Sequence, residues 1–188
     1  MSDLIRTFIA VEIESSDVLK KLIQSRDFLV STGADIKPVE DENIHLTLRF
    51  IGEIPVGIVK ALCNEITNLK FERFRIHIKG IGVFPSLNRP RVIWAGIEEG
   101  SNKVIDLHTQ IERIIRKLGI PTDREEFTPH VTIARVKGVR GLESLIKALS
   151  QLTNTDFGYS DVTRVYIKKS VLTPSGPIYS NICQVDLL

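Results

Sequence analysis

The amino-acid sequence predicts an α+β fold of two pseudo-twofold-related halves, with mainly antiparallel sheets flanked by helices and a groove between two lobes. Strand and helix patterns alternate along the chain, and their order in the first part is repeated in the second. A single offset of 85 residues relates the two parts. It superimposes Arg6 on Arg91, Ala10 on Ala95, Leu22 on Leu107, His45 on His130 and Thr47 on Thr132.

We interpret this constant offset as the trace of an old duplication. The duplicated halves cover about residues 1–85 and 86–170, and a further strand at residues 178–187 closes the chain. No linker separates the halves, so residues 1–188 are expected to form one bilobal domain. A solenoid is excluded, because its repeats are far shorter and more numerous.

The composition is that of an ordinary globular protein. The chain has 188 residues, of which 43% are apolar and 26% charged, and its net charge of +2 permits a nucleic-acid partner without indicating one. No apolar run reaches the length of a membrane span, and the first residues lack the basic start of a signal peptide. We therefore expect a cytoplasmic monomer with no membrane partner. Neither Cys63 nor Cys183 belongs to a CxxC pair, which favours reduced, buried thiols.

Hydrophobic periodicity predicts the elements of the first half. Ser15 supplies an N-cap for a helix, Pro55 opens a second helix, and Gly80 begins a Gly/Pro-rich stretch expected to be a loop. The expected elements are strands at 4–13, 43–51 and 74–79, helices at 15–30 and 55–69, and a loop at 80–90.

The same criteria predict the second half. We expect strands at 91–97, 127–136, 162–167 and 178–187, helices at 101–118 and 142–152, and a loop at 173–177. His77 alternates with charged residues and is expected to be solvated, while His108 lies within a helix and belongs to no motif.

One four-residue pattern occurs twice, as His45-Leu46-Thr47-Leu48 and as His130-Val131-Thr132-Ile133. Side chains alternate between the two faces of a strand, so histidine and threonine two residues apart point the same way. The apolar residues between them then face the core. Each copy therefore presents an imidazole beside a hydroxyl, and two copies brought together would suit acid/base chemistry on a phosphate.

These residues resemble the RNA 2′,3′-cyclic phosphodiesterases, formerly called 2′-5′ RNA ligases, of the two-histidine phosphoesterase superfamily. The resemblance covers nearly the whole chain. It is carried by Arg6 to Ala10, Asn43 to Glu53, Gly82 to Pro85, Pro90 to Gly96 and Phe127 to Arg135. Val131 and Ile133 replace commoner leucines, and the motifs are otherwise complete.

The resemblance implies two lobes around a groove, one motif strand from each, and hydrolysis of a 2′,3′-cyclic phosphate on an RNA end to a 2′-phosphomonoester. Reversible 2′-5′ ligation accompanies this activity in some relatives. By analogy, His45 is the proton donor and His130 the proton acceptor, with Thr47 and Thr132 beside them. The implied partner is RNA with such an end, for example tRNA halves, and no cofactor or metal is implied.

The chemistry gives a reason for the paired motifs. Water attack and departure of the ribose oxygen occur on opposite sides of phosphorus, so an acid and a base must flank the phosphate. Imidazole suits both roles because its unperturbed pKa is about 6.5. Threonine hydroxyls can donate to the non-bridging oxygens, which gain charge in the transition state. Sequence symmetry alone does not say which histidine is the acid.

Two further residues are candidates for substrate binding. The family places an arginine near the phosphate at the position of Arg135, but strict alternation puts Arg135 on the face opposite His130, so its access requires a β-bulge or the strand's end. Phe50 holds the matching place in the first half, where it would stack on a base. Core packing for Phe50 and a structural role for Arg135 are the alternatives.

Other interpretations of the chain remain open. One alternative is that both motif histidines are structural. Another is that they bind zinc, although each motif supplies only one ligand and no cysteine accompanies it. The substrate would otherwise be a small cyclic nucleotide, or the protein an RNA-end-binding factor with incidental turnover. Five basic residues also have two interpretations. They either form an ordinary solvated surface or guide an RNA tail: Arg164, Lys168, Lys169, Arg89 and Arg91.

Overall fold

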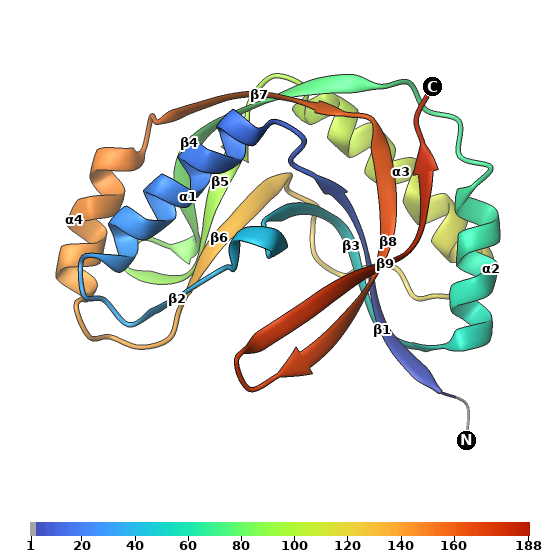
Figure 1. Ribbon diagram of the computed structural model, residues 1–188, viewed down its shortest axis with the longest axis horizontal. Helices are drawn as coiled ribbons and strands as arrows, with labels where there is room; N and C mark the ends of the chain where they lie inside the picture. Colours follow the sequence, from blue (N-terminus) through green and yellow to red (C-terminus); the bar gives the residue numbers. More distant parts are fainter. Residues whose placement is uncertain (1–2) are drawn as a thin grey trace.

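The computed structural model describes residues 3–188 and confirms the α+β class (Figure 1). The strands are β1 (Leu4–Glu12), β2 (Ile36–Pro38), β3 (His45–Pro55), β4 (Phe74–Ser86), β5 (Arg89–Ile97), β6 (His130–Val136), β7 (Asp156–Val162), β8 (Arg164–Thr173) and β9 (Gly176–Asp186). The helices are α1 (Ser16–Val30), α2 (Val56–Ile66), α3 (Ser101–Lys117) and α4 (Leu142–Leu152), with a 3-10 turn η1 (Asp41–Asn43).

The strands form one antiparallel sheet whose order is symmetric about its centre. The order is β7-β4-β5-β6-β3-β1-β8-β9, with β2 paired to β6. The offset of 85 relates β3 to β6 and β1 to β5, which stand at equal distances from the centre. One lobe contains β6, β5, β4 and β7, and the other contains β3, β1, β8 and β9.

Each lobe contains elements from both halves of the sequence. β4 follows α2 in the chain but pairs with β5 in the second lobe, whereas β8 pairs with β1 in the first lobe. Helices exchange as well, because α1 packs with α4 on the side of β7 and β6, and α2 packs with α3 on the side of β3 (Figure 1). Each lobe is therefore complete only when the whole chain has folded.

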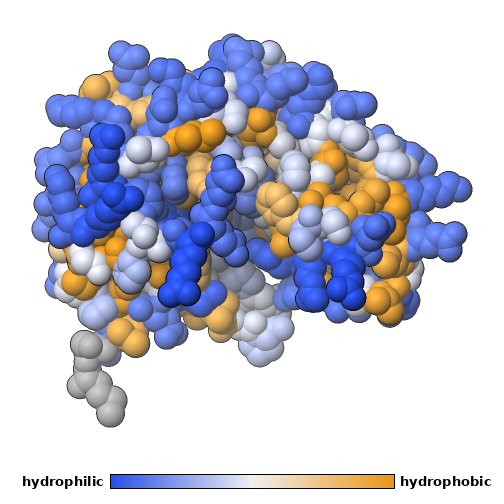
Figure 2. Space-filling model, turned by 180° about the vertical axis from the view of Figure 1, so that it is seen from behind, coloured by the Kyte–Doolittle hydropathy of each residue, from blue (hydrophilic) through white to orange (hydrophobic). Residues whose placement is uncertain are grey.

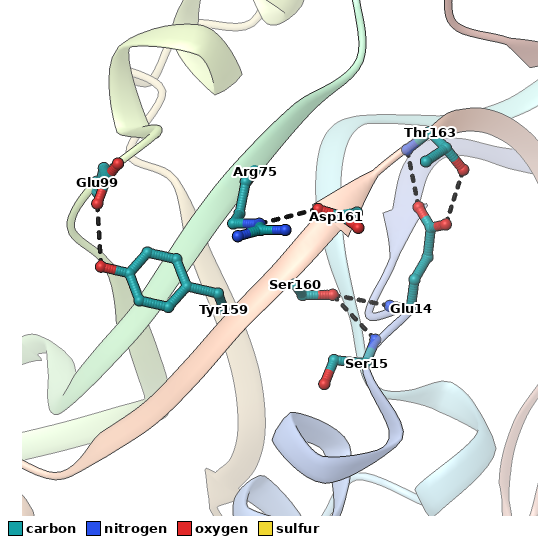
Figure 3. A network of polar contacts seen from close by, with 8 residues as sticks. All are labelled: Glu14, Ser15, Arg75, Glu99, Tyr159, Ser160, Asp161 and Thr163. Atoms are coloured by element: carbon teal, nitrogen blue, oxygen red, sulfur yellow. Dashed lines mark hydrogen bonds and ion pairs between the residues drawn. The ribbon is translucent and has the colours of Figure 1, made fainter.

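Polar contacts hold the edge strand β7 against elements on both sides (Figure 3). The Ser160 hydroxyl oxygen accepts hydrogen bonds from the backbone N–H groups of Glu14 and Ser15, at 3.0 and 3.1 Å. Arg75 on β4 pairs with Asp161 at 3.1 Å, and the Tyr159 hydroxyl donates to Glu99 at 3.0 Å. These contacts tie the beginning of α1 to the second lobe.

One apolar core runs beneath the sheet and its helices. It includes the motif residues Leu46, Leu48, Val131 and Ile133, all essentially inaccessible to solvent. Hydrophilic residues cover most of the surface seen from behind, which is hollowed near its middle (Figure 2). No helix within residues 3–188 has the length and apolar character needed to cross a bilayer.

The prediction of a loop at residues 80–90 is wrong. β4 continues to Ser86, and the chain reverses only at Leu87 and Asn88 before β5. Gly80 adopts a positive φ of 81° at a register shift of the β4–β5 ladder, so it makes an irregularity within the strand. Pro85 and Pro90 pair with each other near the hairpin tip, where the ladder ends.

The strand expected at 162–167 is also wrong in its bounds. Two strands, β7 and β8, meet there and are separated by Thr163. The motif strands begin at His45 and His130, later than expected, while the 142–152 helix has the expected bounds. The short strand β2 lies in a stretch for which no element was predicted.

The expectation of reduced, buried thiols is wrong. Cys63 and Cys183 form a disulfide, with their Cα atoms 6.1 Å apart, and both are half-buried. Cys63 lies on α2 and Cys183 on β9, and these elements pack together in the first lobe. The sequence separation of 120 concealed this contact.

Candidate active site

The two motif strands are neighbours at the centre of the sheet. Leu46 on β3 and Val131 on β6 are Cα partners in an antiparallel ladder, and both side chains point into the core. Alternation then places the histidine and threonine of both motifs on the opposite face. His45, Thr47, His130 and Thr132 all line one groove of about 1090 Å³ between the lobes. The structure thus brings together the two pairs that the sequence predicted.

His45 is held by three kinds of contact. Its Nδ1 lies 2.6 Å from the Asn43 carbonyl oxygen, and its Nε2 lies 2.7 Å from the Thr47 hydroxyl oxygen. The ring packs against Phe8 and Tyr179, with centroids 5.2 and 5.5 Å away. Burial is the main cause that lowers the pKa of His45 to about 4.

His130 has a related environment with less polar contact. Its Nδ1 lies 2.6 Å from the Thr128 carbonyl oxygen, and its ring packs edge-on against Phe84 at 5.1 Å. Burial also lowers the pKa of His130, and nearby Arg135 lowers it further. Thr132 makes no hydrogen bond to this ring, in contrast to Thr47 beside His45.

The hydrogen bonds determine the tautomer of both histidines. A carbonyl oxygen can only accept, so Nδ1 carries a proton in each ring and Nε2 remains free to accept or donate. In neutral His45 the Thr47 hydroxyl donates to Nε2. Both imidazoles are therefore set to exchange a proton through Nε2 on the groove side.

The surroundings of the two histidines differ, because a partly buried ion pair lies beside His45. Lys168 on β8 donates to Glu12 at 2.9 Å, and Glu12 is the Cα partner of His45. Both charges act on His45, the ammonium lowering its pKa and the carboxylate raising it. At the matching position in the second lobe, the partner of His130 is Gly96. Lys168 is thus paired, contrary to the idea that it would guide RNA.

A bulge in each motif strand brings the two further candidates into the groove. Thr47 pairs with Ala10 but Arg49 pairs with Ile9, so Leu48 is an extra residue in β3. In β6 the extra residue is Ile133, between Thr132 and Ala134. Each bulge resets the alternation, and Phe50 and Arg135 line the groove as a result.

Phe50 is 45% exposed, which excludes core packing for this ring. The Arg6 guanidinium lies over it, 4.6 Å from the centroid. Arg6 and its offset partner Arg91 both line the groove. The constant offset was the signal that related these two arginines in the sequence, although the prediction considered only Arg91, as a guide for an RNA tail, and gave Arg6 no role.

Sequence reasoning missed a buried network beside Phe50. Arg49 Nε donates to Glu112 at 2.6 Å, and its other nitrogens donate to the backbone carbonyls of Phe50, at 2.9 Å, and Pro121. His108 lies 3.6 Å from Glu112 and lines the groove. The network ties α3 to the bulged part of β3, which supports the groove wall.

The expectation that His77 is solvated is wrong. Its ring is stacked on that of Tyr159, its Cα partner on β7, with centroids 4.4 Å apart, and the residue is only 8% exposed. Its two nitrogens lie 3.2 Å from Glu98 and 2.8 Å from Asp156. This contact lowers the pKa of Asp156. His77 lies outside the groove and has a structural role between strands.

Within residues 3–188, no three His, Cys, Asp or Glu side chains gather as a metal would require. The alternative of a zinc site therefore lacks a ligand set in that part of the chain.

Comparison with known proteins agrees with this geometry. The sequence matches the family described as LigT like Phosphoesterase twice, over residues 12–94 and 96–179. It is 40% identical over 165 residues to the RNA 2′,3′-cyclic phosphodiesterase of Aeropyrum pernix, covering 88% of this chain and 94% of the relative. A protein with the same name from Methanothermobacter thermautotrophicus is 35% identical over 179 residues, covering 94% and 96%.

Solved structures share the fold over nearly the whole chain. TT0787 of Thermus thermophilus aligns with a TM-score of 0.76 at 27% identity, covering 96% of this chain and 97% of that one. E. coli LigT in apo form aligns with a TM-score of 0.79 at 21% identity, covering 99% of each, a likeness of fold alone. The chain belongs to the LigT-like phosphoesterase family.

Proposed function

We propose that the protein hydrolyses the 2′,3′-cyclic phosphate ends of RNA to 2′-phosphomonoesters without a metal ion. The observation that carries this proposal is the pair of imidazole Nε2 atoms presented to one groove by two paired strands. The relatives named above are RNA 2′,3′-cyclic phosphodiesterases at up to 40% identity, which supports the same substrate class.

The proposed step is an in-line displacement at phosphorus. Water forms the new P–O bond and gives its proton to Nε2 of His130. The bond from phosphorus to the 3′ oxygen breaks, and Nε2 of His45 gives its proton to that oxygen. Both histidines then re-equilibrate with solvent, so one water molecule is consumed in all. In 2′-5′ ligation a 5′-hydroxyl would take the place of water, with the same acid and base. By microscopic reversibility, cleavage of the 2′-5′ bond by the 3′-hydroxyl would exchange the two roles.

Binding of the substrate must change the contacts of His45. In the free groove its pKa lies near 4, so neutral imidazole predominates at pH 7. The cyclic phosphate carries a negative charge, which favours the protonated ring once bound. Thr47 can then turn from Nε2 toward a non-bridging oxygen. The low pKa alone favours His45 as the base, so its role as donor rests on the family resemblance.

Arg135 and Phe50 have proposed roles on either side of the reacting group. Arg135 is exposed in the groove and its charge acts on His130, which supports a contact to the phosphate. Phe50 offers an exposed ring on the opposite wall, where a base would stack. Thr132, with its hydroxyl beside His130, would donate to the second non-bridging oxygen.

RNA such as tRNA halves is the proposed partner, acted on by a monomer. We also propose a cytoplasmic location. The Cys63–Cys183 disulfide would be unusual in the cytoplasm of a mesophile, although intracellular proteins of hyperthermophiles are rich in disulfides.

The deciding experiment uses an oligonucleotide with a 2′,3′-cyclic phosphate end in the presence of EDTA. We expect full turnover and a product that chromatography resolves as the 2′-phosphate. A 3′-phosphate product, or turnover only with added metal, would contradict the mechanism. Tight binding with no turnover would instead indicate an RNA-end-binding factor.

A further inference from the structure

The two walls of the groove carry unequal charges. One wall is formed by β2, β6 and β5, and we call it the basic wall: Lys37, Arg91, Arg135 and Lys137 line the groove there. The other wall includes the segment before β6, which we call the acidic segment: Asp123, Glu125 and Glu126 line it. The offset of 85 relates Lys37 to Thr122, Arg135 to Phe50 and Lys137 to Gly52, so three of the four cations of the basic wall have an uncharged counterpart.

The cations of the basic wall form a row. Lys37 and Arg135 are Cα partners on neighbouring strands, so their side chains stand next to each other. Lys137 follows two residues after Arg135, and Arg91 adjoins Val92, the partner of Arg135 on β5. Strands lie about 4.8 Å apart and residues two apart about 7 Å, so the row extends over more than one nucleotide.

The row is free to bind an anion. All four side chains are exposed, and within residues 3–188 none of them makes an ion pair. Among the described residues, Glu40 is the one carboxylate that lines the groove near Lys37. By contrast, two of the five cations considered from the sequence, Arg164 and Lys168, are bound to Asp186 and Glu12, whereas Arg91 is one of the four in this row.

The acidic segment has the opposite effect. Asp123, Glu125 and Glu126 are exposed and repel a polyanion from that side of the groove. Of the two arginines on this side, Arg49 is paired with Glu112, and Arg6 lies over the Phe50 ring and keeps its charge, so carboxylates outnumber free cations here. A strand of RNA therefore meets attraction on one wall and repulsion on the other.

We infer that the RNA strand leaves the histidines over the basic wall, with the cyclic phosphate at Arg135 and the backbone phosphates before it on Lys37, Arg91 and Lys137. This inference rests on the proposed function and extends it, since it assigns single-stranded RNA of several nucleotides as the substrate class. The unequal walls also give the symmetric groove a direction. The phosphodiesters before the cyclic end follow β6 and β2, away from the acidic segment.

The test compares two substrates with one pair of variants. The double variant Lys37→Gln/Lys137→Gln is assayed on a cyclic-phosphate oligonucleotide of about six nucleotides and on a 2′,3′-cyclic mononucleotide, which has no backbone phosphate for the two lysines to bind. We expect kcat/KM for the oligonucleotide to fall about tenfold at low salt, and its slope against log salt concentration to flatten by about 1.4. The rate on the mononucleotide is expected to stay within about twofold.

A matched control removes the same charge elsewhere. Lys60→Gln/Lys147→Gln changes two exposed lysines on α2 and α4, and we expect both rates to match the unmodified protein. If the two lysine pairs affect the oligonucleotide equally, the assigned path is wrong. The path is also wrong if Asp123→Asn/Glu126→Gln changes oligonucleotide turnover while Lys37→Gln/Lys137→Gln does not.

Failure of the proposed function has a different signature. In that case the unmodified protein turns over neither the mononucleotide nor the oligonucleotide. Direct binding of an oligonucleotide ending in a 2′-phosphate, followed by fluorescence anisotropy at two salt concentrations, then tests the path by itself. Equal affinity of the Lys37→Gln/Lys137→Gln variant and the unmodified protein would overturn it.

Discussion

Leu46 and Val131 are Cα partners on two antiparallel strands, and this pair joins β3 to β6 at the centre of the sheet. The residues on either side of the pair are the motif histidines and threonines. In an antiparallel ladder the position before Leu46 faces the position after Val131, so His45 lies across from Thr132 and Thr47 from His130. The pair lies at the centre of the mirrored strand order and fixes the distance between the two imidazoles.

Replacing either histidine should remove turnover without unfolding the protein. We expect His45→Ala and His130→Ala each to lower kcat by at least about a hundredfold, since each removes one proton transfer. Circular dichroism and the thermal midpoint provide the folding control. A variant that keeps near-full rate on the cyclic-phosphate oligonucleotide would contradict the paired mechanism.

The pH profile should be displaced toward acid. Burial lowers the pKa of His45 to about 4 and holds the pKa of His130 below its usual 6.5. One ring must be protonated and the other neutral, so kcat/KM, which reports the free enzyme, should be bell-shaped with its maximum below about pH 6.5. A maximum above pH 7 would show that the free groove does not depress these values. The same bell results whichever ring is the acid.

A leaving-group substitution separates the two histidines. A cyclic substrate with sulfur in place of the 3′ bridging oxygen expels a thiolate, which needs no proton donor. We expect this substrate to restore turnover to His45→Ala but not to His130→Ala, because only the second variant lacks the base. Restoration of His130→Ala alone would reverse the proposed roles.

His45 should make the folded protein sensitive to acid. Its folded pKa of about 4 lies below its unfolded value, so the unfolded chain binds the proton first as pH falls from 6.5 to 4. The free energy of unfolding should therefore drop through this window by up to about 3 kcal/mol from this residue. In His45→Asn, whose amide can still donate to the Asn43 carbonyl, urea titrations at pH 7 and pH 4.5 should show a smaller drop. Equal drops in both proteins would contradict the burial argument.

The disulfide should stabilise the first lobe. Cys63→Ser/Cys183→Ser opens a covalent link across 120 residues, and we expect a loss of about 2–5 kcal/mol in the free energy of unfolding. Denaturant titration with and without a thiol reductant measures it. Reductant should shift the midpoint of the unmodified protein and leave that of the variant unchanged. Identical midpoints for both proteins without reductant would show that the bond contributes nothing.

Local patterns in the sequence determined the α+β class, the helix at 142–152 and the two His-x-Thr faces. Helix period, strand alternation and an N-cap serine act over a few residues, so the sequence alone reveals them. The offset of 85 related the two histidines through the sequence alone, because a duplication preserves order and spacing. The need for a bulge to bring Arg135 beside His130 followed from the same alternation.

Tertiary structure decided what depends on strand order and on contacts between distant residues. The exchange of β4 and β8 between lobes, the Cys63–Cys183 bond and the stacking of His77 on Tyr159 all join segments far apart in the chain. No local period specifies which strand becomes a neighbour, because backbone hydrogen bonds are alike for every partner and register depends on the assembled core. For the same reason only the folded groove shows that Lys37 stands beside Arg135, while its offset counterpart Thr122 adjoins the acidic segment. The sequence determined two equivalent motifs, and the tertiary structure made their surroundings unequal.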